Sequence, residues 1–98
     1  MEFKHKKTGA RFVVPDRPTV REQLEYFSES SAVNQKDRLG RLWAGARVLM
    51  TEWAWDEMPD RFISLDEITN PTAAEVITWA SLAVFKHMNA LEDLPKNS

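Results

Sequence analysis

Carboxylates are the most concentrated groups in this chain that could do chemistry, at Glu52, Asp56, Glu57 and Asp60. Paired acids can act as general acid and base or hold a hard cation. A spacing of four residues would put Glu52 and Asp56 on the same side of a helix. The four acids flank two tryptophans at the expected end of a helix, without the loop spacing of a calcium site. We therefore interpret them as a solvated acidic patch.

The remaining groups of chemical interest do not combine into a recognisable site. The two histidines, His5 and His87, each lack a second ligand at helical spacing, and the chain has no cysteine. A glycine-rich phosphate loop and a nucleophile elbow are both missing, and no serine has an evident histidine base. His87 falls near the end of an expected helix, where a cationic side chain suits the macrodipole. We expect no enzymatic activity, metal or cofactor.

Basic and aromatic side chains alternate near the start of the chain, at Phe3, Lys4, Lys6, Lys7, Arg11 and Phe12. Such a pattern could form a ribbon that binds nucleic acid. However, the whole chain has a net charge of −2 and a sequence pI of about 5.7, and lysines on an edge strand also deter unwanted sheet extension. We expect no nucleic-acid partner.

The first sixteen residues read as a β-hairpin. Two short runs between Phe3 and Pro15 are separated by a turn that contains Gly9, a pattern typical of hairpins. A two-stranded hairpin is marginal in water, so it must dock on helices or pair with another chain. We expect it to support oligomerisation, either by edge pairing or by charge contact with acidic residues of a second copy, and we assign this role to Phe3, Phe12, Val13 and Val14.

Two amphipathic helices should follow. Residues 19–22 (Thr-Val-Arg-Glu) form a capping box, which predicts a helix from there to about Ser30–Ser31. Its apolar side chains make one narrow stripe, Val20, Leu24 and Phe27. A longer three-four rhythm predicts a second helix from about 34–37 to Asp56. The rhythm is carried by Leu39, Leu42, Trp43, Ala46, Leu49, Met50 and Trp53.

Two glycines fall inside this second predicted helix, Gly40 and Gly45. Each should cost about 1 kcal/mol relative to alanine. Close packing of a neighbouring helix would explain why they are present.

The last helix is predicted from Asn70–Pro71, an N-cap followed by proline, to about Leu91. Residues 61–69 read as a short helix or an ordered loop. The ten residues 76–85 carry no charge and are apolar on every helical side, so this helix must be covered by the core or leave one face for a partner. The uncharged stretch is about half of a bilayer span, so we expect no membrane partner.

A chain of 98 residues with 43% hydrophobic residues predicts a single domain over 1–98. We expect a mainly α fold of three to four helices with an N-terminal β-hairpin. Its parts would be a hairpin arm over 1–16, a helical core over 19–91 and a flexible tail over 92–98. The charged N-terminus is not followed by an apolar run, so we expect a cytoplasmic protein rather than a secreted one.

Several large apolar side chains fall outside the predicted core stripes. Trp55 lies off the stripe of the second helix, and either exposure as an anchor or burial in the core is compatible with its position. On the last helix, Trp79, Leu82 and Phe85 reach beyond the face formed by the smaller apolar residues. We predict a partner-binding surface on this helix, with Trp55 and Met58 at its edge.

The order of these parts resembles the small tail assembly chaperones of long-tailed bacteriophages. The resemblance lies in a basic hairpin that ends in Val-Val-Pro, the segment 17–27 (RPTVREQLEYF), a tryptophan-containing central helix and the segment 89–98 (NALEDLPKNS). It implies a protein that binds the tape measure protein, keeps it soluble and helps the tail tube polymerise around it. It also implies self-association, a site of action in the host cytoplasm and absence from the mature virion.

A different class of function is also compatible with the sequence. The chain could be a small phage-encoded inhibitor or regulator of the anti-defence type, which binds a bacterial protein through the acidic patch. The two interpretations predict different contact surfaces. Loss of binding after replacement of the acids would favour the inhibitor, and loss only after replacement of Trp79 or Phe85 would favour the chaperone.

Overall fold

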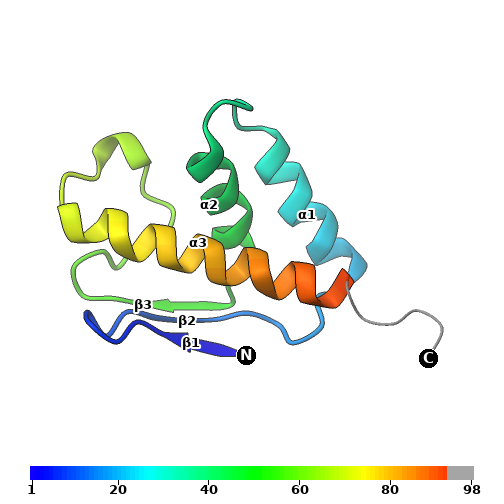
Figure 1. Cartoon of the computed structure of the whole chain (residues 1–98), viewed down its shortest axis with the longest axis horizontal. Helices are drawn as coiled ribbons and strands as arrows, with labels where there is room; N and C mark the ends of the chain where they lie inside the picture. The colour runs from blue at the N-terminus through cyan, green and yellow to red at the C-terminus, as the bar shows by residue number, and fades with distance from the viewer. Residues whose placement is uncertain (93–98) are drawn as a thin grey trace.

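The computed structural model describes residues 1–92, which form three α-helices and a three-stranded antiparallel sheet of order β1-β2-β3 (Figure 1). In chain order the elements are β1 (Glu2–Lys4), β2 (Arg11–Val13), α1 (Val20–Ser31), α2 (Arg38–Leu49), β3 (Glu52–Ala54), a 3-10 turn (Leu65–Glu67) and α3 (Pro71–Glu92). The fold is therefore α+β rather than mainly α, and the described residues contain no fourth α-helix. The predicted tail, apart from Glu92 at the end of α3, lies outside the described residues.

The predicted N-terminal hairpin is confirmed. β1 and β2 pair antiparallel with Phe3 opposite Phe12. Gly9 has a φ of 75°, a left-handed conformation that a residue without a Cβ adopts at little cost. The loop closes through the His5 amide, which donates to the Ala10 carbonyl at 2.7 Å.

The second helix is shorter than its apolar rhythm predicts, because the chain leaves the helix after Leu49 and returns to the sheet. Met50 is extended, with φ −64° and ψ 125°, and β3 then pairs with the free edge of β2, placing Trp53 opposite Phe12. A spacing of three between residues 50 and 53 fits a helix, but the aromatic residues that follow suit a strand. The pairing with β2 decides the outcome, since it satisfies backbone groups that would otherwise lie unpaired at the sheet edge.

The capping box at the start of α1 is confirmed. The Thr19 amide donates to the Glu22 carboxylate at 2.8 Å, and the Glu22 amide donates to the Thr19 hydroxyl at 3.2 Å. The helix ends at Ser31, as predicted. Its apolar stripe, however, faces solvent, while Tyr26 is the side chain of α1 that is buried.

Close packing of α1 on α2 explains Gly45. A Cβ at this position would lie 2.9 Å from the Tyr26 ring and 3.1 Å from the Tyr26 carbonyl oxygen. Gly40 has a different reason: a Cβ there would meet the carboxylate of Asp37, which caps α2 by accepting from the Gly40 amide at 2.9 Å. The predicted close helix neighbour is thus found at one glycine and a helix cap at the other.

The loop between β3 and α3 is tied to the end of α2 by Arg61. Its guanidinium donates to the Arg47 carbonyl at 3.0 Å and to the Met50 carbonyl at 3.2 Å. These are carbonyls at the C-terminal end of α2, which have few helical partners. The loop itself contains the 3-10 turn, in agreement with the short helix or ordered loop predicted for 61–69.

α3 begins where the sequence predicts. The Asn70 side chain accepts from the Thr72 amide at 2.9 Å, and the helix continues to Glu92. It packs on α2, and its buried side chains Val76, Ile77, Ala80 and Val84 belong to a core shared with the sheet. In the part of the chain that the structure describes, no helix is long and apolar enough to span a bilayer.

Candidate functional site

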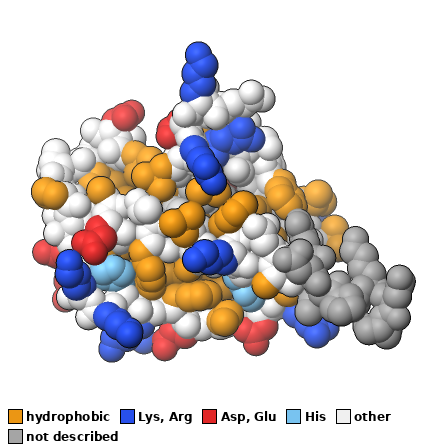
Figure 2. Space-filling model, viewed as in Figure 1, with side chains coloured by type: hydrophobic (Ala, Val, Ile, Leu, Met, Phe, Trp, Pro, Cys, Tyr) orange, Lys and Arg blue, Asp and Glu red, His pale blue; other side chains and the backbone are white. Residues whose placement is uncertain are grey.

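An apolar groove of about 480 Å³ lies between β1 and the outer side of α3. Figure 2 shows this face, on which hydrophobic side chains gather along α3 and toward β1. The lining residues are Met1, Phe3, Trp79, Leu82, Ala83, Lys86, His87 and Ala90. The groove combines large apolar walls with small residues and a few polar groups, the usual composition of a binding site.

The α3 wall follows the period of the helix. From Trp79 onward the lining residues recur at intervals of three and four up to Ala90, so they form one continuous stripe. Eleven helical steps correspond to about 16 Å, or three turns. Ala83 and Ala90 are small, so a partner can approach the α3 backbone closely between Trp79 and the end of the stripe.

The sheet wall is made rigid by aromatic packing. The Phe3 ring stacks on Phe12, with ring centroids 5.0 Å apart and planes at 22°. Phe12 is fully buried and meets Trp79 edge to face at 5.2 Å. Because Phe12 contacts one residue of each wall, the groove is attached directly to the hydrophobic core.

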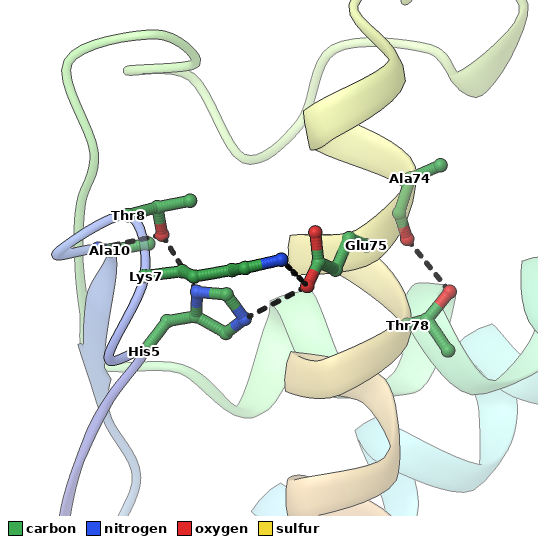
Figure 3. A network of polar contacts seen from close by, with 7 residues as sticks. All are labelled: His5, Lys7, Thr8, Ala10, Ala74, Glu75 and Thr78. Carbon is green, nitrogen blue, oxygen red and sulfur yellow. Dashed lines mark hydrogen bonds and ion pairs between the residues drawn. The ribbon is translucent and has the colours of Figure 1, made fainter.

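A polar network connects the hairpin turn to the first turns of α3 (Figure 3). This part of α3 lies on the N-terminal side of Trp79. The buried His5 is hydrogen-bonded through Nδ1 to the Thr8 hydroxyl at 3.0 Å, and its Nε2 faces Glu75 at 4.0 Å. The Lys7 ammonium lies 3.8 Å from the same Glu75 oxygen. His5 also meets the Trp79 ring edge to face at 5.0 Å. The network therefore holds Trp79 in place.

The other end of the groove is held by His87. Its Nε2 donates to the Pro15 carbonyl at 3.0 Å, and its ring lies edge-on to Phe3 at 6.5 Å. This bond is the main role of His87 that the structure shows, in place of the interaction with the helix macrodipole predicted from sequence. Together the two histidines attach the hairpin to α3 at both ends of the groove.

The ammonium group of Met1 adds a further contact at this end. It donates to the Val14 carbonyl at 2.7 Å and lies 2.8 Å from the Asp16 carboxylate. The hydrogen bond to this ammonium, and its charge, hold the pKa of Asp16 below its usual value. The nearby His87 lowers this pKa further, to a smaller extent.

Two of the five predicted partner-binding residues line the groove, Trp79 and Leu82. Leu82 is 39% exposed. Phe85 is only partly buried but does not line the groove. The structure therefore brings Trp79 and Leu82 together on one side of the last helix and leaves Phe85 outside the groove.

Trp55 and Met58 do not present the surface edge predicted for them. They are 6% and 5% exposed and belong to the core. The reason is the third strand: with Trp53 paired in β3, the following residues turn inward, and the Trp53 indole donates to the Met58 carbonyl at 2.7 Å. Burial, the other alternative for Trp55, is the correct one.

Of the four residues predicted to support oligomerisation, two are buried in the core and two are not. Phe12 and Val14 are buried in the core, so neither side chain can contact another chain in the folded state. Phe3 lines the groove, and Val13 is partly buried. The hairpin docks on the helices of its own chain instead of requiring a second one, because its aromatic face packs on α3.

The charged groups that could do chemistry stay apart. Glu52 lies on β3 and Asp56 in the loop after it, so the two do not share a helix face, and all four acids of the patch are exposed. Within residues 1–92 no group of His, Asp and Glu side chains is arranged to hold a metal ion. In the basic hairpin, Lys7 pairs with Glu75 and Arg11 lies 3.5 Å from Glu2. Two of the four basic residues considered for nucleic-acid binding, Lys7 and Arg11, therefore lie beside carboxylates.

The groove includes residues that were not among the predicted partner-binding residues. Ala83, Lys86 and Ala90 could have been found by continuing the three-four spacing from Trp79 along α3. Met1 could not, because its place depends on the pairing of β1 with β2 and on the docking of the sheet.

No family model matches the chain, and no curated protein or solved structure does so either.

Proposed function

We propose that this protein is a tail assembly chaperone of a long-tailed bacteriophage, which binds the tape measure protein, keeps it soluble and assists polymerisation of the tail tube. The observation that carries the proposal is the apolar groove between β1 and α3. The tape measure protein is proposed as the client because of the resemblance in the order of parts. The groove is a surface that could bind such a client. Under this proposal the protein acts in the host cytoplasm and is absent from the mature virion.

The shape of the groove suits one amphipathic helix. Its stripe on α3 extends for about three turns, which is more than the roughly two turns over which a helix presents anchors at i, i+3 or i+4, and i+7. Trp79 and Leu82 provide large apolar contacts at one end, and Ala83 and Ala90 leave room for the client backbone. A long helical protein offers many such segments, each exposed until assembly covers it.

Charge gives the client segment a preferred character. Lys86 lines the groove and is exposed, and no ion pair is found for it within residues 1–92. A client helix with a carboxylate beside its apolar stripe would pair with this ammonium. Such exposed pairs contribute specificity more than affinity.

The mechanism is reversible capture. An apolar client face that would aggregate in water is covered by the groove. A groove of three turns covers only part of a long client helix and leaves the rest of that helix open to other subunits. Tube subunits that contact the client over a larger area would then replace the chaperone.

The test is co-expression of this chain with the tape measure protein, with the soluble fraction and a pull-down as readouts. The informative variant is Leu82→Asp, which adds a charge at an exposed groove position outside the core. The matched control is Thr78→Asp, the same charge on an exposed position of the same helix that does not line the groove. We expect the wild type and the control to solubilise the client and Leu82→Asp to fail.

The inhibitor alternative predicts a different set of results. The acids of the patch are exposed, and their replacement by lysine at Asp56 and Glu57 would abolish binding to a bacterial protein while leaving the groove intact. Failure of the wild type to solubilise the tape measure protein would refute the chaperone proposal. Equal solubilisation by Leu82→Asp would leave a chaperone whose binding surface is not the groove.

A further inference from the structure

α1 turns its apolar stripe away from the rest of the molecule. Val20, Leu24 and Phe27 are 72%, 63% and 47% exposed, whereas Tyr26 is buried against α2. A surface helix ordinarily directs its apolar stripe at the core. The opposite arrangement leaves three large apolar side chains side by side in water, on a helix of 12 residues.

We propose that a second copy of this chain covers the stripe, with the two α1 helices packed antiparallel about a two-fold axis. Leu24 lies near the middle of the stripe, four residues after Val20 and three before Phe27. In an antiparallel pair Leu24 packs on Leu24 of the second copy, and Val20 packs on Phe27 of the second copy. The stripe is self-complementary, which a two-fold interface requires.

The charges beside the stripe favour the same partner. Arg21 and Glu25 line its shallow groove on one flank, both exposed, and neither forms an ion pair within residues 1–92. An antiparallel two-fold pair brings the same flanks of the two helices together, so Arg21 of each copy lies beside Glu25 of the other. A parallel pair forms neither contact and aligns the two helix macrodipoles. Because each copy carries one cation and one anion on this flank, a second copy matches the flank better than a client of a single charge.

The inference is independent of the proposed function, because the α1 stripe and the groove share no residue. A helix of 12 residues is about 18 Å long, so the interface is small and the dimer should be weak. The contact surface differs from the hairpin surface predicted from sequence, whose main residues are buried.

The test is sedimentation equilibrium of the full chain over roughly 1 to 500 µM, a range that covers weak dimers. We expect a monomer–dimer equilibrium in the wild type. Leu24→Asp should weaken it at least about 100-fold, because two carboxylates replace two packed leucines at the axis. Thr78→Asp, on an exposed position of α3, should leave it unchanged, and circular dichroism should show that both variants are folded.

A charge exchange tests the antiparallel arrangement. Arg21→Glu and Glu25→Arg should each weaken the dimer by about three- to tenfold, since each breaks two exposed pairs. The double variant should recover the wild-type constant. Recovery is expected only if Arg21 and Glu25 of different copies lie together.

A crosslink tests the axis itself. The chain has no cysteine, so Leu24→Cys should form a disulfide-linked dimer under mild oxidation, and Thr78→Cys should not. A monomer at every concentration, or a dimer that Leu24→Asp does not weaken, would overturn the inference. Retained client solubilisation by Leu24→Asp would show that the proposed function stands separately.

Discussion

Replacing Gly45 by alanine tests how closely α1 packs on α2. Alanine should gain up to about 1 kcal/mol from its higher helix propensity. Against this gain, the new Cβ would lie 2.9 Å from the Tyr26 ring and 3.1 Å from the Tyr26 carbonyl oxygen. One of these atoms belongs to the backbone, so α1 itself must shift, and overpacking of this kind costs about 1–3 kcal/mol. We expect a net loss of about 1 kcal/mol.

The matched control is Gly40→Ala in the same helix. Here the three atoms nearest to the Cβ all belong to the Asp37 carboxylate, a side chain that can turn away. The lost cap costs about 0.5–2 kcal/mol and is offset by about 1 kcal/mol of propensity. Its stability should therefore stay close to that of the wild type.

The assay is urea unfolding followed by circular dichroism, with the free energy of unfolding compared at an unchanged slope. Gly45→Ala should unfold at lower urea than both the wild type and Gly40→Ala. A stabilisation of about 1 kcal/mol in Gly45→Ala would mean that propensity acts without opposition. The reasoning about the α1–α2 contact would then be refuted.

Two further substitutions test the contacts of Arg61 and Asp16. Arg61→Ala should lower the free energy of unfolding by about 2 kcal/mol, because two carbonyls at the end of α2 lose a charged donor; urea unfolding unchanged from the wild type would contradict this. Asp16→Asn should weaken the dependence of the free energy of unfolding on pH in the acid range. The pKa of Asp16 is lowered in the folded state, so its contribution is present above the unfolded pKa of about 3.9 and is lost as the pH falls through the folded value. Unfolding measured between about pH 2 and 6 checks this, and identical profiles would exclude the contribution.

Features that depend on neighbouring residues were predictable from the sequence. The turn at Gly9, the capping box at Thr19 and the start of α3 at Asn70 each rest on a local rule of backbone conformation or capping. These signals determine where elements begin because the groups that satisfy them are only a few residues away.

Features that depend on distant pairing were not predictable. The rhythm through Met50 and Trp53 fits a helix equally well, and only the free edge of β2 turns this segment into β3. The side of α1 that is buried depends on a close approach between Tyr26 and Gly45, which no spacing within α1 reveals.

The groove was predictable only in part. Its α3 wall was predicted in part, through Trp79 and Leu82, because helical periodicity is local. Its second wall needed the docked sheet, and so Phe3 was assigned to contacts between chains. Trp55 shows the reverse error, since a residue off a helical stripe becomes a core residue once the helix has ended.

The most direct test of the groove is a photo-activated crosslinker at position 82 or, as a control, position 78, in cells that also express the tape measure protein. The proposal predicts a crosslink to the tape measure protein from position 82 and none from position 78. Crosslinking of equal yield from both positions, or from position 57 in the acidic patch alone, would contradict the proposal that the groove between β1 and α3 binds the client.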